Sequence, residues 1–166
     1  TIQMDSNGRA QATLLPNTAY YLVETKAPAG YVPRHDRIAF TTGNDGGRVA
    51  IDEQPGTINL RIVKLDTATN AGPQVGSSLA GAEFTCVSQS TPGWAQILTT
   101  DESGQATLAD VPLGTFTIYE SKAPEGYLPS NDSWTYTVGA DQLGDSGVVE
   151  IESRISDIPR SEEHTS

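Results

Sequence analysis

The sequence has one cysteine, two histidines, few basic residues and no long apolar run. Cys86 has no partner for an internal disulfide, and no Cys and His residues are spaced as zinc ligands. The chain carries 10 Lys and Arg against 21 Asp and Glu, and its net charge of -11 disfavours binding to nucleic acid or to an anionic membrane. No apolar stretch could span a bilayer. The sequence therefore indicates no metal, no cofactor and no membrane insertion.

Turn-forming residues are abundant instead. Sixteen glycines and ten prolines are spread along the chain and separate short apolar runs, a pattern typical of all-β proteins. Hydrophobic residues make up 36% of the sequence, which is enough for the cores of small β-sandwiches. Cys86 alternates with Ala82 and Phe84 on one predicted strand, so we expect a buried, inert thiol. His35 lies in a polar segment and is expected to be solvated.

One stretch of sequence occurs twice. Residues 20–31 and 116–127 each lead from a predicted strand into a glutamate, Glu24 or Glu120, and then into the pattern Lys-Ala-Pro-x-Gly-Tyr. A constant offset of 96 residues aligns the copies without a gap, and the matched pairs include Asp5 with Asp101, Gly8 with Gly104, Pro16 with Pro112 and Asp36 with Asp132. An internal repeat of this kind predicts tandem domains.

The register of the repeat sets the predicted boundaries. The first copy has no counterpart for the part of the second copy that precedes residue 97. We therefore expect residues 1–56 to be the C-terminal part of a sandwich truncated at its N-terminus, and residues 57–159 to be a complete sandwich. Residues 160–166, which include His164, break the strand pattern and resemble a translated sequencing adapter, so they are expected to be a non-native tail.

Apolar alternation and turn signals predict the individual strands. In the first copy we expect a turn at residues 5–8 and strands near residues 9–14, 19–25, 37–42 and 47–52. The second copy is expected to contain seven strands, the number in an immunoglobulin-like sandwich, near residues 58–66, 82–88, 95–100, 105–109, 115–120, 133–138 and 148–157.

Three ionisable residues fall on apolar faces of these strands. Residues two apart in a strand share a face, so Lys64, Glu120 and Asp157 should point inward with the apolar residues that precede them. An isolated buried charge is costly, and the three side chains should therefore meet one another. The sequence leaves two simple outcomes open: a buried salt-bridge triad, or strand ends at which the charges reach solvent.

The same residues resemble a known family. The segments Leu79–Phe84 and Tyr119–Tyr127, together with Lys64 in the first strand of the second copy, resemble the B-type repeat (CnaB) domains of Gram-positive collagen adhesins and the related SpaA-type pilin domains. The resemblance covers nearly all of residues 1–159. It implies prealbumin-like sandwiches that serve as a structural stalk on the Gram-positive cell surface. Neighbouring domains of the same protein are the implied partners, with other pilin subunits or host matrix as further candidates.

The resemblance also implies a reaction. In this family a first-strand lysine and a last-strand Asn or Asp form an intramolecular isopeptide bond, which the repeated glutamate promotes. Carried over, Lys64 is the nucleophile, Asp157 the electrophile and Glu120 the proton shuttle. Burial favours the neutral forms of amines and carboxylic acids, which are the reactive species. Each domain reacts once, so the chain is not expected to be an enzyme.

The first copy has only part of this set. Glu24 is the equivalent of Glu120, but the matching lysine would precede residue 1. Asp52 is the nearest candidate acceptor in the sequence. On the predicted strand, Asp52 lies on the same face as Arg48 and Ala50, opposite the face of Val49 and Ile51. A β-bulge would be needed to turn it inward.

Two other functions are compatible with the sequence. A module that binds a host ligand would need exposed Trp94, Trp134 or Tyr119 to form a contiguous patch. A hydrolase would need a second acid beside Glu24 or Glu120 in an open cleft.

Two short motifs suggest further functions, which we regard as the weaker interpretations. Oxygen-bearing side chains in residues 66–72 and in the two Asp-x-x-Gly turns could bind calcium, but their spacing fits Asx turns and connecting loops. Residues 15–19 resemble a sortase sorting motif, but they align with residues 111–115 and are expected to form a turn before a strand.

Overall fold

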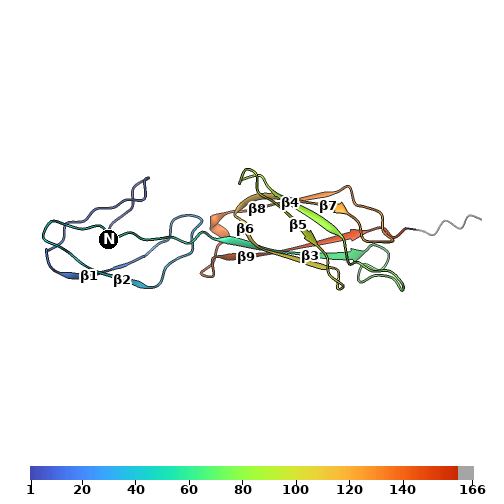
Figure 1. Ribbon diagram of the computed structural model, residues 1–166, viewed down its shortest axis with the longest axis horizontal. Coiled ribbons are helices and arrows are strands. Elements are labelled where there is room, and N and C mark those ends of the chain that lie inside the picture. The colour runs from blue at the N-terminus through green and yellow to red at the C-terminus, as the bar shows by residue number, and fades with distance from the viewer. Residues whose placement is uncertain (161–166) are drawn as a thin grey trace, which may run out of the picture. The chain divides into compact units, whose positions relative to one another are not determined.

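The computed structural model describes residues 1–160 and consists mainly of β-structure (Figure 1), which confirms the predicted all-β class. The chain divides into two compact units. The first contains Thr1–Ala27 and Pro33–Glu53, and the second contains Pro28–Val32 and the residues from Gln54 onward. Of the predicted tail, only Arg160 is described, so His164 lies outside the described residues.

The second unit is a sandwich of two sheets (Figure 1). One sheet has the strand order β6-β3-β9, and the other has the order β5-β4-β7-β8. All the strands expected in the second copy are present with small shifts at their ends, namely β3 (Thr57–Asp66), β4 (Glu83–Ser88), β5 (Ala95–Thr99), β6 (Gln105–Pro112), β7 (Gly114–Lys122), β8 (Ser133–Val138) and β9 (Val148–Asp157). A 3-10 turn, η1 (Ala140–Gln142), precedes β9.

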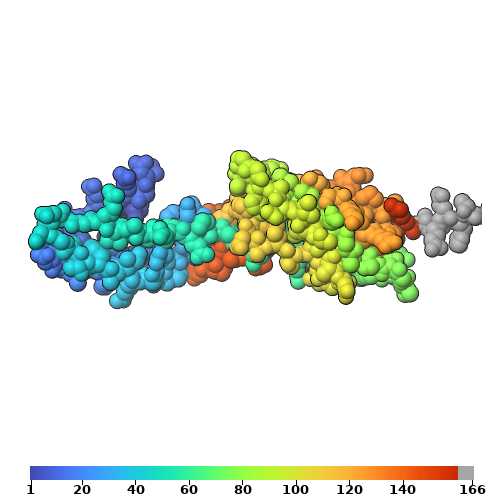
Figure 2. Space-filling model, in the orientation of Figure 1, coloured from blue at the N-terminus to red at the C-terminus, as the bar shows by residue number. Residues whose placement is uncertain are grey.

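Strand β3 is the central strand of its sheet. It pairs antiparallel with β6 and parallel with β9, so the first and last strands of the unit lie side by side. Ile58, Leu60 and Ile62 point into the core and are almost completely buried, whereas Arg61 faces out and forms an ion pair with Glu152. Only small parts of β3 reach the surface in the space-filling view (Figure 2).

The core fills the space between the two sheets. Phe84 of β4 and Phe116 of β7 are fully buried, and the ring of Phe116 stacks on that of Tyr136 with 5.5 Å between centroids. Cys86 is also fully buried, and burial raises the pKa of its thiol to about 11. The expectation of a buried thiol is confirmed.

The two Asp-x-x-Gly segments form the expected turns. The Oδ1 atom of Asp5 accepts the amides of Asn7 and Arg9, at 2.8 and 2.9 Å. The Oδ1 atom of Asp101 likewise accepts hydrogen bonds from the backbone amides of Ser103, at 2.9 Å, and Gln105, at 3.0 Å. These carboxylates satisfy backbone donors, as Asx turns do. Within residues 1–160, no group of three or more His, Cys, Asp and Glu side chains is placed to hold a metal ion.

The first unit contains a two-stranded antiparallel sheet. Its strands are β1 (Ala19–Val23) and β2 (Arg37–Thr41), and the rings of Tyr20 and Phe40 stack across them at 5.8 Å. Within residues 15–19, Pro16 and Asn17 form a turn and Ala19 begins β1, as expected. His35 is exposed, which is also as expected.

The strands expected near residues 9–14 and 47–52 are wrong, because neither segment is a strand. By the repeat, they correspond to β6 and to the region of β9, and in the second unit those strands pair with the two edges of β3. Among the described residues of the first unit, no strand takes the place of β3. Apolar alternation alone does not make a strand, because its backbone also needs a hydrogen-bonding partner.

Residues 1–160 contain no helix with the length and apolarity required to cross a membrane.

The alternation along β3 leads to a first prediction. We expect Ile62→Ala to lower the free energy of unfolding of the second unit by about 2–5 kcal/mol, because it leaves a cavity in the core. The neighbouring change Arg61→Ala removes only an exposed ion pair and should cost less than about 1 kcal/mol. Chemical denaturation of both variants measures these free energies of unfolding. Similar decreases for the two variants would show that β3 does not have the described inner face.

Candidate functional site

Three ionisable side chains from three strands meet inside the second unit. They are Lys64 of β3, Glu120 of β7 and Asp157 at the end of β9. The Lys64 Nζ atom lies 2.8 Å from Glu120 Oε1 and also contacts Asp157 Oδ1. All three side chains have an exposed fraction of 0%. The structure therefore brings together the residues that strand parity had predicted to point inward.

The sheet registers account for this meeting. In the parallel pair, Lys64 lies opposite Ile155, so Asp157, two residues further along β9, points to the same face as the lysine. Glu120 comes from the facing sheet, where β7 pairs with β4 and places it opposite Phe84. The cluster thus joins the two sheets of the sandwich.

The surroundings of the cluster are largely apolar. Lys64 Nζ lies 5.2 Å from the centre of the Phe84 ring, where the ring quadrupole attracts a cation. The Glu120 Oε2 atom accepts a hydrogen bond of 2.8 Å from the backbone amide of Ser130. This bond leaves Oε1 directed at the lysine. No donor among the described residues forms a hydrogen bond with Asp157 Oδ2.

One ammonium group faces two carboxyl groups in this cluster. Burial raises the pKa of Asp157 to about 6, the charge and hydrogen bond of Lys64 oppose this rise, and the charge of Glu120 adds to it. Asp157 therefore holds a proton more readily than an exposed aspartate does. A carboxylic acid next to an amine and a second carboxylate can exchange protons and form an amide.

Asp66 is a fourth buried ionisable residue, which the sequence analysis had placed in a candidate calcium loop. Its side chain shares the inner face of β3 with Lys64, and it is completely buried. The Oδ2 atom accepts a 2.8 Å hydrogen bond from the Tyr127 hydroxyl, and Oδ1 accepts one of 2.7 Å from the Ala68 amide. The parity that identified Lys64 extends to residue 66 and could have identified Asp66 as well.

The hydrogen bond between Asp66 and Tyr127 changes the pKa of both side chains. Burial raises the pKa of the Asp66 carboxyl, but the hydrogen bonds from Tyr127 and from backbone amides outweigh it, and the net change is a lowered pKa. Burial and the neighbouring Asp66 raise the pKa of Tyr127 to about 12. The tyrosine that ends the repeated sequence thus ties the turn after β7 to the end of β3.

The first unit holds the equivalent glutamate in the same way. Glu24 Oε2 accepts a 2.7 Å hydrogen bond from the Arg34 amide, as Glu120 does from Ser130 ten residues further on. Asp52 is not brought to Glu24. It is exposed, and its backbone carbonyl accepts a 3.0 Å hydrogen bond from the Arg34 guanidinium.

The carboxylate that approaches Glu24 belongs to Glu53. Burial and the charge of Glu24 raise the pKa of Glu53. Two signals in the sequence could have indicated this residue. Glu53 has the parity of Val49 and Ile51, and Glu53-x-Pro55 matches Asp157-x-Pro159.

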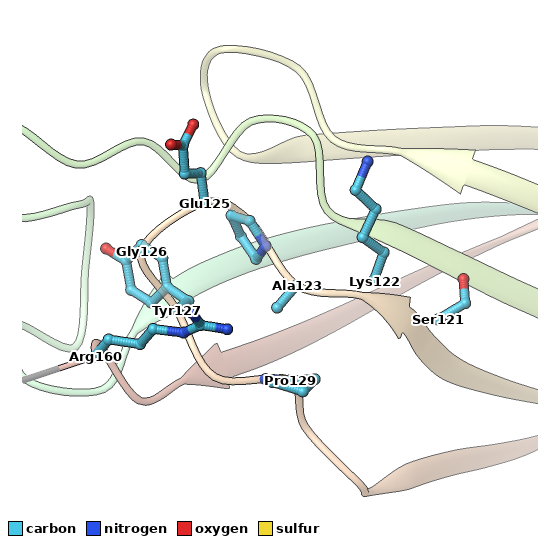
Figure 3. Close-up of a pocket in the computed structure, with 9 residues that line it drawn as sticks. Ser121, Lys122, Ala123, Glu125, Gly126, Tyr127, Pro129 and Arg160 are labelled. Atoms are coloured by element: carbon cyan, nitrogen blue, oxygen red, sulfur yellow. The ribbon is translucent and has the colours of Figure 1, made fainter.

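The other candidate functions have less support. Trp94 and Trp134 are partly buried and pack against the core, and among the three aromatic residues only Tyr119 is exposed. The Glu120 carboxylate is buried and does not line a cleft. A shallow depression lies beside the repeated sequence (Figure 3), where Lys122 and Glu125 extend to one side of the backbone and Arg160 to the other. Neither Lys64, Glu120 nor Asp157 lines it.

Comparisons with known proteins agree with this fold. The family model of SpaA prealbumin-like fold domains matches residues 1–55 and 59–153. The solved structure of the Bacillus anthracis TIE protein is 25% identical with a TM-score of 0.69, and the match covers 95% of this chain and 28% of that one. The group B streptococcus pilus 2b backbone protein is 21% identical with a TM-score of 0.51, over 84% of this chain and 53% of that one. The chain thus spans well under two thirds of either structure. No curated protein matches the chain.

The pair of Asp66 and Tyr127 leads to a second prediction. Tyr127→Phe should lower the free energy of unfolding at neutral pH by about 1.5–3 kcal/mol, the range for a hydrogen bond to a charged group. Because the folded-state pKa of Asp66 is lowered, its contribution is present above the unfolded pKa and is lost as pH falls through the folded one. The cost of Tyr127→Phe should therefore shrink in acid.

Tyr31→Phe is the matched control, because Tyr31 occupies the same place in the first copy and is exposed. The free energy of unfolding of the Tyr31→Phe variant should equal that of the parent chain at every pH. The described hydrogen bond would be contradicted if both variants lost the same free energy of unfolding. It would also be contradicted if the loss for Tyr127→Phe did not change with pH.

Proposed function

We propose that this chain, which belongs to the family of SpaA prealbumin-like fold domains, is a stalk module of a Gram-positive cell-surface pilin or adhesin. Residues 57–159 form one domain, and residues 1–56 belong to a second. The likeness to the Bacillus anthracis TIE protein and to a streptococcal pilus backbone protein supports this assignment. The domains act as spacers, and their partners are neighbouring domains, with other pilin subunits or host matrix beyond them.

In this proposal Lys64 and Asp157 become joined by an isopeptide bond. The observation that carries it is the contact of Lys64 Nζ with Asp157 in a site with no exposed side chain. Three ionisable groups in an apolar core are otherwise difficult to explain, because apolar side chains of similar volume would be at least as stable there. Covalent bond formation removes two of the charges.

The reaction is a condensation. The neutral Lys64 amine attacks the Cγ atom of the Asp157 carboxylic acid, and the new N–C bond forms. Glu120 accepts the amine proton and passes it to the departing oxygen, so that the C–O bond breaks and water leaves. The backbone amide of Ser130 keeps Glu120 Oε1 at the lysine. The fold supplies the proximity that would otherwise require a second substrate, and each domain reacts once.

The consequence is mechanical. Strands β3 and β9 are the first and last of the unit and run parallel. A force that enters at the start of β3 passes to Lys64 and crosses directly to the end of β9, and the strands in between carry no load. By analogy with a disulfide that closes a loop of similar length, the bond would stabilise the unit by about 4–5 kcal/mol.

The mass of the intact protein tests the bond. We expect the parent chain, measured under denaturing conditions, to be lighter than its sequence by one water. Glu120→Ala should keep the full mass, because no group then moves the proton. Glu125→Ala, in the same repeated sequence but exposed, is the matched control and should still lose water. A full-mass parent chain would refute the cross-link and leave a buried salt bridge.

Pulling single molecules tests the load path. With the bond intact, the segment between Lys64 and Asp157 cannot extend when the chain is stretched from its ends. Lys64→Arg, which has no reactive amine, should therefore release about 300 Å more chain on unfolding, at about 3.3–3.6 Å per residue. Lys122→Arg changes an exposed lysine and should behave as the parent does. Equal extensions for the parent and Lys64→Arg would exclude a covalent load path.

A further inference from the structure

We propose that β5 is a docking edge at which two copies of this chain pair, strand against strand and antiparallel, with Ile97 of one copy opposite Ile97 of the other. The partner is a second copy of the chain, and the two four-stranded sheets join into one continuous sheet. The proposal concerns an exposed edge of the second unit, and it does not depend on the bond between Lys64 and Asp157.

The backbone of β5 is paired on one side. Among residues 1–160, β4 is the only strand that pairs with it. A 2.9 Å hydrogen bond from Thr100 N to Ala82 O continues this pairing beyond the strand. Residues that bond to a given neighbour alternate along an antiparallel strand, so the even-numbered residues of β5 bond to β4. The N–H and C=O groups of Ala95, Ile97 and Thr99 therefore point away from β4.

Strand β5 lacks the features that protect two other edges of the unit. A free edge can pair with another chain, and charged residues, proline or a bulge usually prevent this. The pairing of β6 with β3 is interrupted by a register shift, and β6 ends at Pro112. Strand β9 carries Glu150, Glu152 and Arg154. Strand β5 has the sequence Ala-Gln-Ile-Leu-Thr, without charge or proline, and four of its five residues are exposed.

The other uncharged edge strand, β8, gains less from pairing. Its exposed residues are Ser133, Thr135 and Thr137, and the hydroxyls of both threonines already form 2.9 Å hydrogen bonds with threonines of β7. Ile97 of β5, by contrast, is 66% exposed. Pairing two β5 strands removes this side chain and its counterpart from water, which is favourable, and places two β-branched side chains opposite each other.

Charge selects a second copy in the antiparallel orientation. The chain has a net charge of -11, so two copies repel and can approach closely only where like charges do not face each other. In the antiparallel pair, the first charged residues after β5, Asp101 and Glu102, lie opposite Gly93 and Pro92 of the second copy. In a parallel pair, each of these carboxylates would face its own counterpart. The edge is thus complementary to itself about Ile97.

The proposed contact is small. Five residues at about 3.3 Å each span about 17 Å, and interfaces of this kind, below about 1,200 Å², are typical of weak and transient complexes. In a stalk of repeated domains several such contacts would act together, and linkage would raise the overall affinity. This last step rests on the proposed function, whereas the pairing of two chains does not.

Sedimentation equilibrium of the full 166-residue chain tests the pairing. The chain should associate with rising concentration and reach a dimer. Raising sodium chloride from about 0.1 M to about 1 M should strengthen the dimer, because the Debye length falls from about 10 to about 3 Å and the repulsion between acidic copies is screened. Ile97→Lys should weaken it at least about tenfold in the lower salt, because like charges then lie directly opposite each other. A parent chain that stays monomeric, or equal association of the parent and Ile97→Lys, would overturn the proposal.

A charge swap distinguishes docking from misfolding. Ile97→Lys and Ile97→Glu should each be monomeric alone, and an equimolar mixture of the two should form a heterodimer. Opposite charges then face each other at the centre of the strand pair. A mixture that stays monomeric would overturn the pairing of Ile97 with its own counterpart.

Thr135→Lys is the matched control, because it adds the same charge to β8, and this variant should associate as the parent does. Weakening equal to that of Ile97→Lys would place the contact on β8 and overturn the proposal. Growth beyond a dimer would show a head-to-tail contact between different edges and would overturn it as well. None of these outcomes depends on the loss of water that reports the cross-link, so failure of the dimer and failure of the cross-link are distinguishable.

Discussion

The buried contact of Lys64 with Glu120 and Asp157 is the constraint on which the second unit depends. These three side chains have no exposed surface, so each can be accommodated only if the other two are in place. A shift of β3, β7 or β9 by one residue would turn its charged side chain to the other face and leave the others unpaired. The cluster therefore fixes the register of three strands and the position of one sheet over the other.

The repeated sequence supplies several parts of this arrangement within a short segment. Its glutamate reaches the lysine, and the backbone amide of Ser130 holds it there. Gly126, with φ of 86°, forms the turn that follows and has a conformation that glycine adopts without strain. Tyr127 then returns to the end of β3 and binds Asp66. The strand that carries the lysine is thus held at two successive inward positions by one segment of β7 and its turn.

Much of the second unit could be predicted from the sequence, because side chains in a strand alternate strictly between two faces. That rule alone places Lys64, Glu120 and Asp157 on the inner faces of their strands. It missed Asp66 because this residue, at the last position of the strand predicted near residues 58–66, was considered only as an oxygen ligand of the candidate calcium loop. The expected strands near residues 9–14 and 47–52 failed for another reason: their sequences have the right pattern, but strand formation depends on a neighbour that the local sequence does not encode.

The acceptor position of the first copy shows a limit of sequence alignment. The offset of 96 holds from Asp5 to Asp36, but Pro55 pairs with Tyr31 as Pro159 does with Tyr127, which corresponds to an offset of 104. A shorter connection before residue 53 accounts for the difference. Asp52 was the nearest acidic residue by inspection, and only the backbone pairing showed that Glu53 takes the place of Asp157.

The central claim is that the second unit converts this ion cluster into a covalent bond. It is tested most directly by the distance between Lys64 Nζ and Asp157 Cγ in a crystal structure at high resolution. If the bond has formed, this distance is that of an amide bond, about 1.33 Å, with continuous electron density between the two side chains. An Asp157 carboxylate with both oxygens intact, the nearer one about 2.7 Å or more from Lys64 Nζ, and no density joining Nζ to Cγ would show an ion pair and no covalent bond.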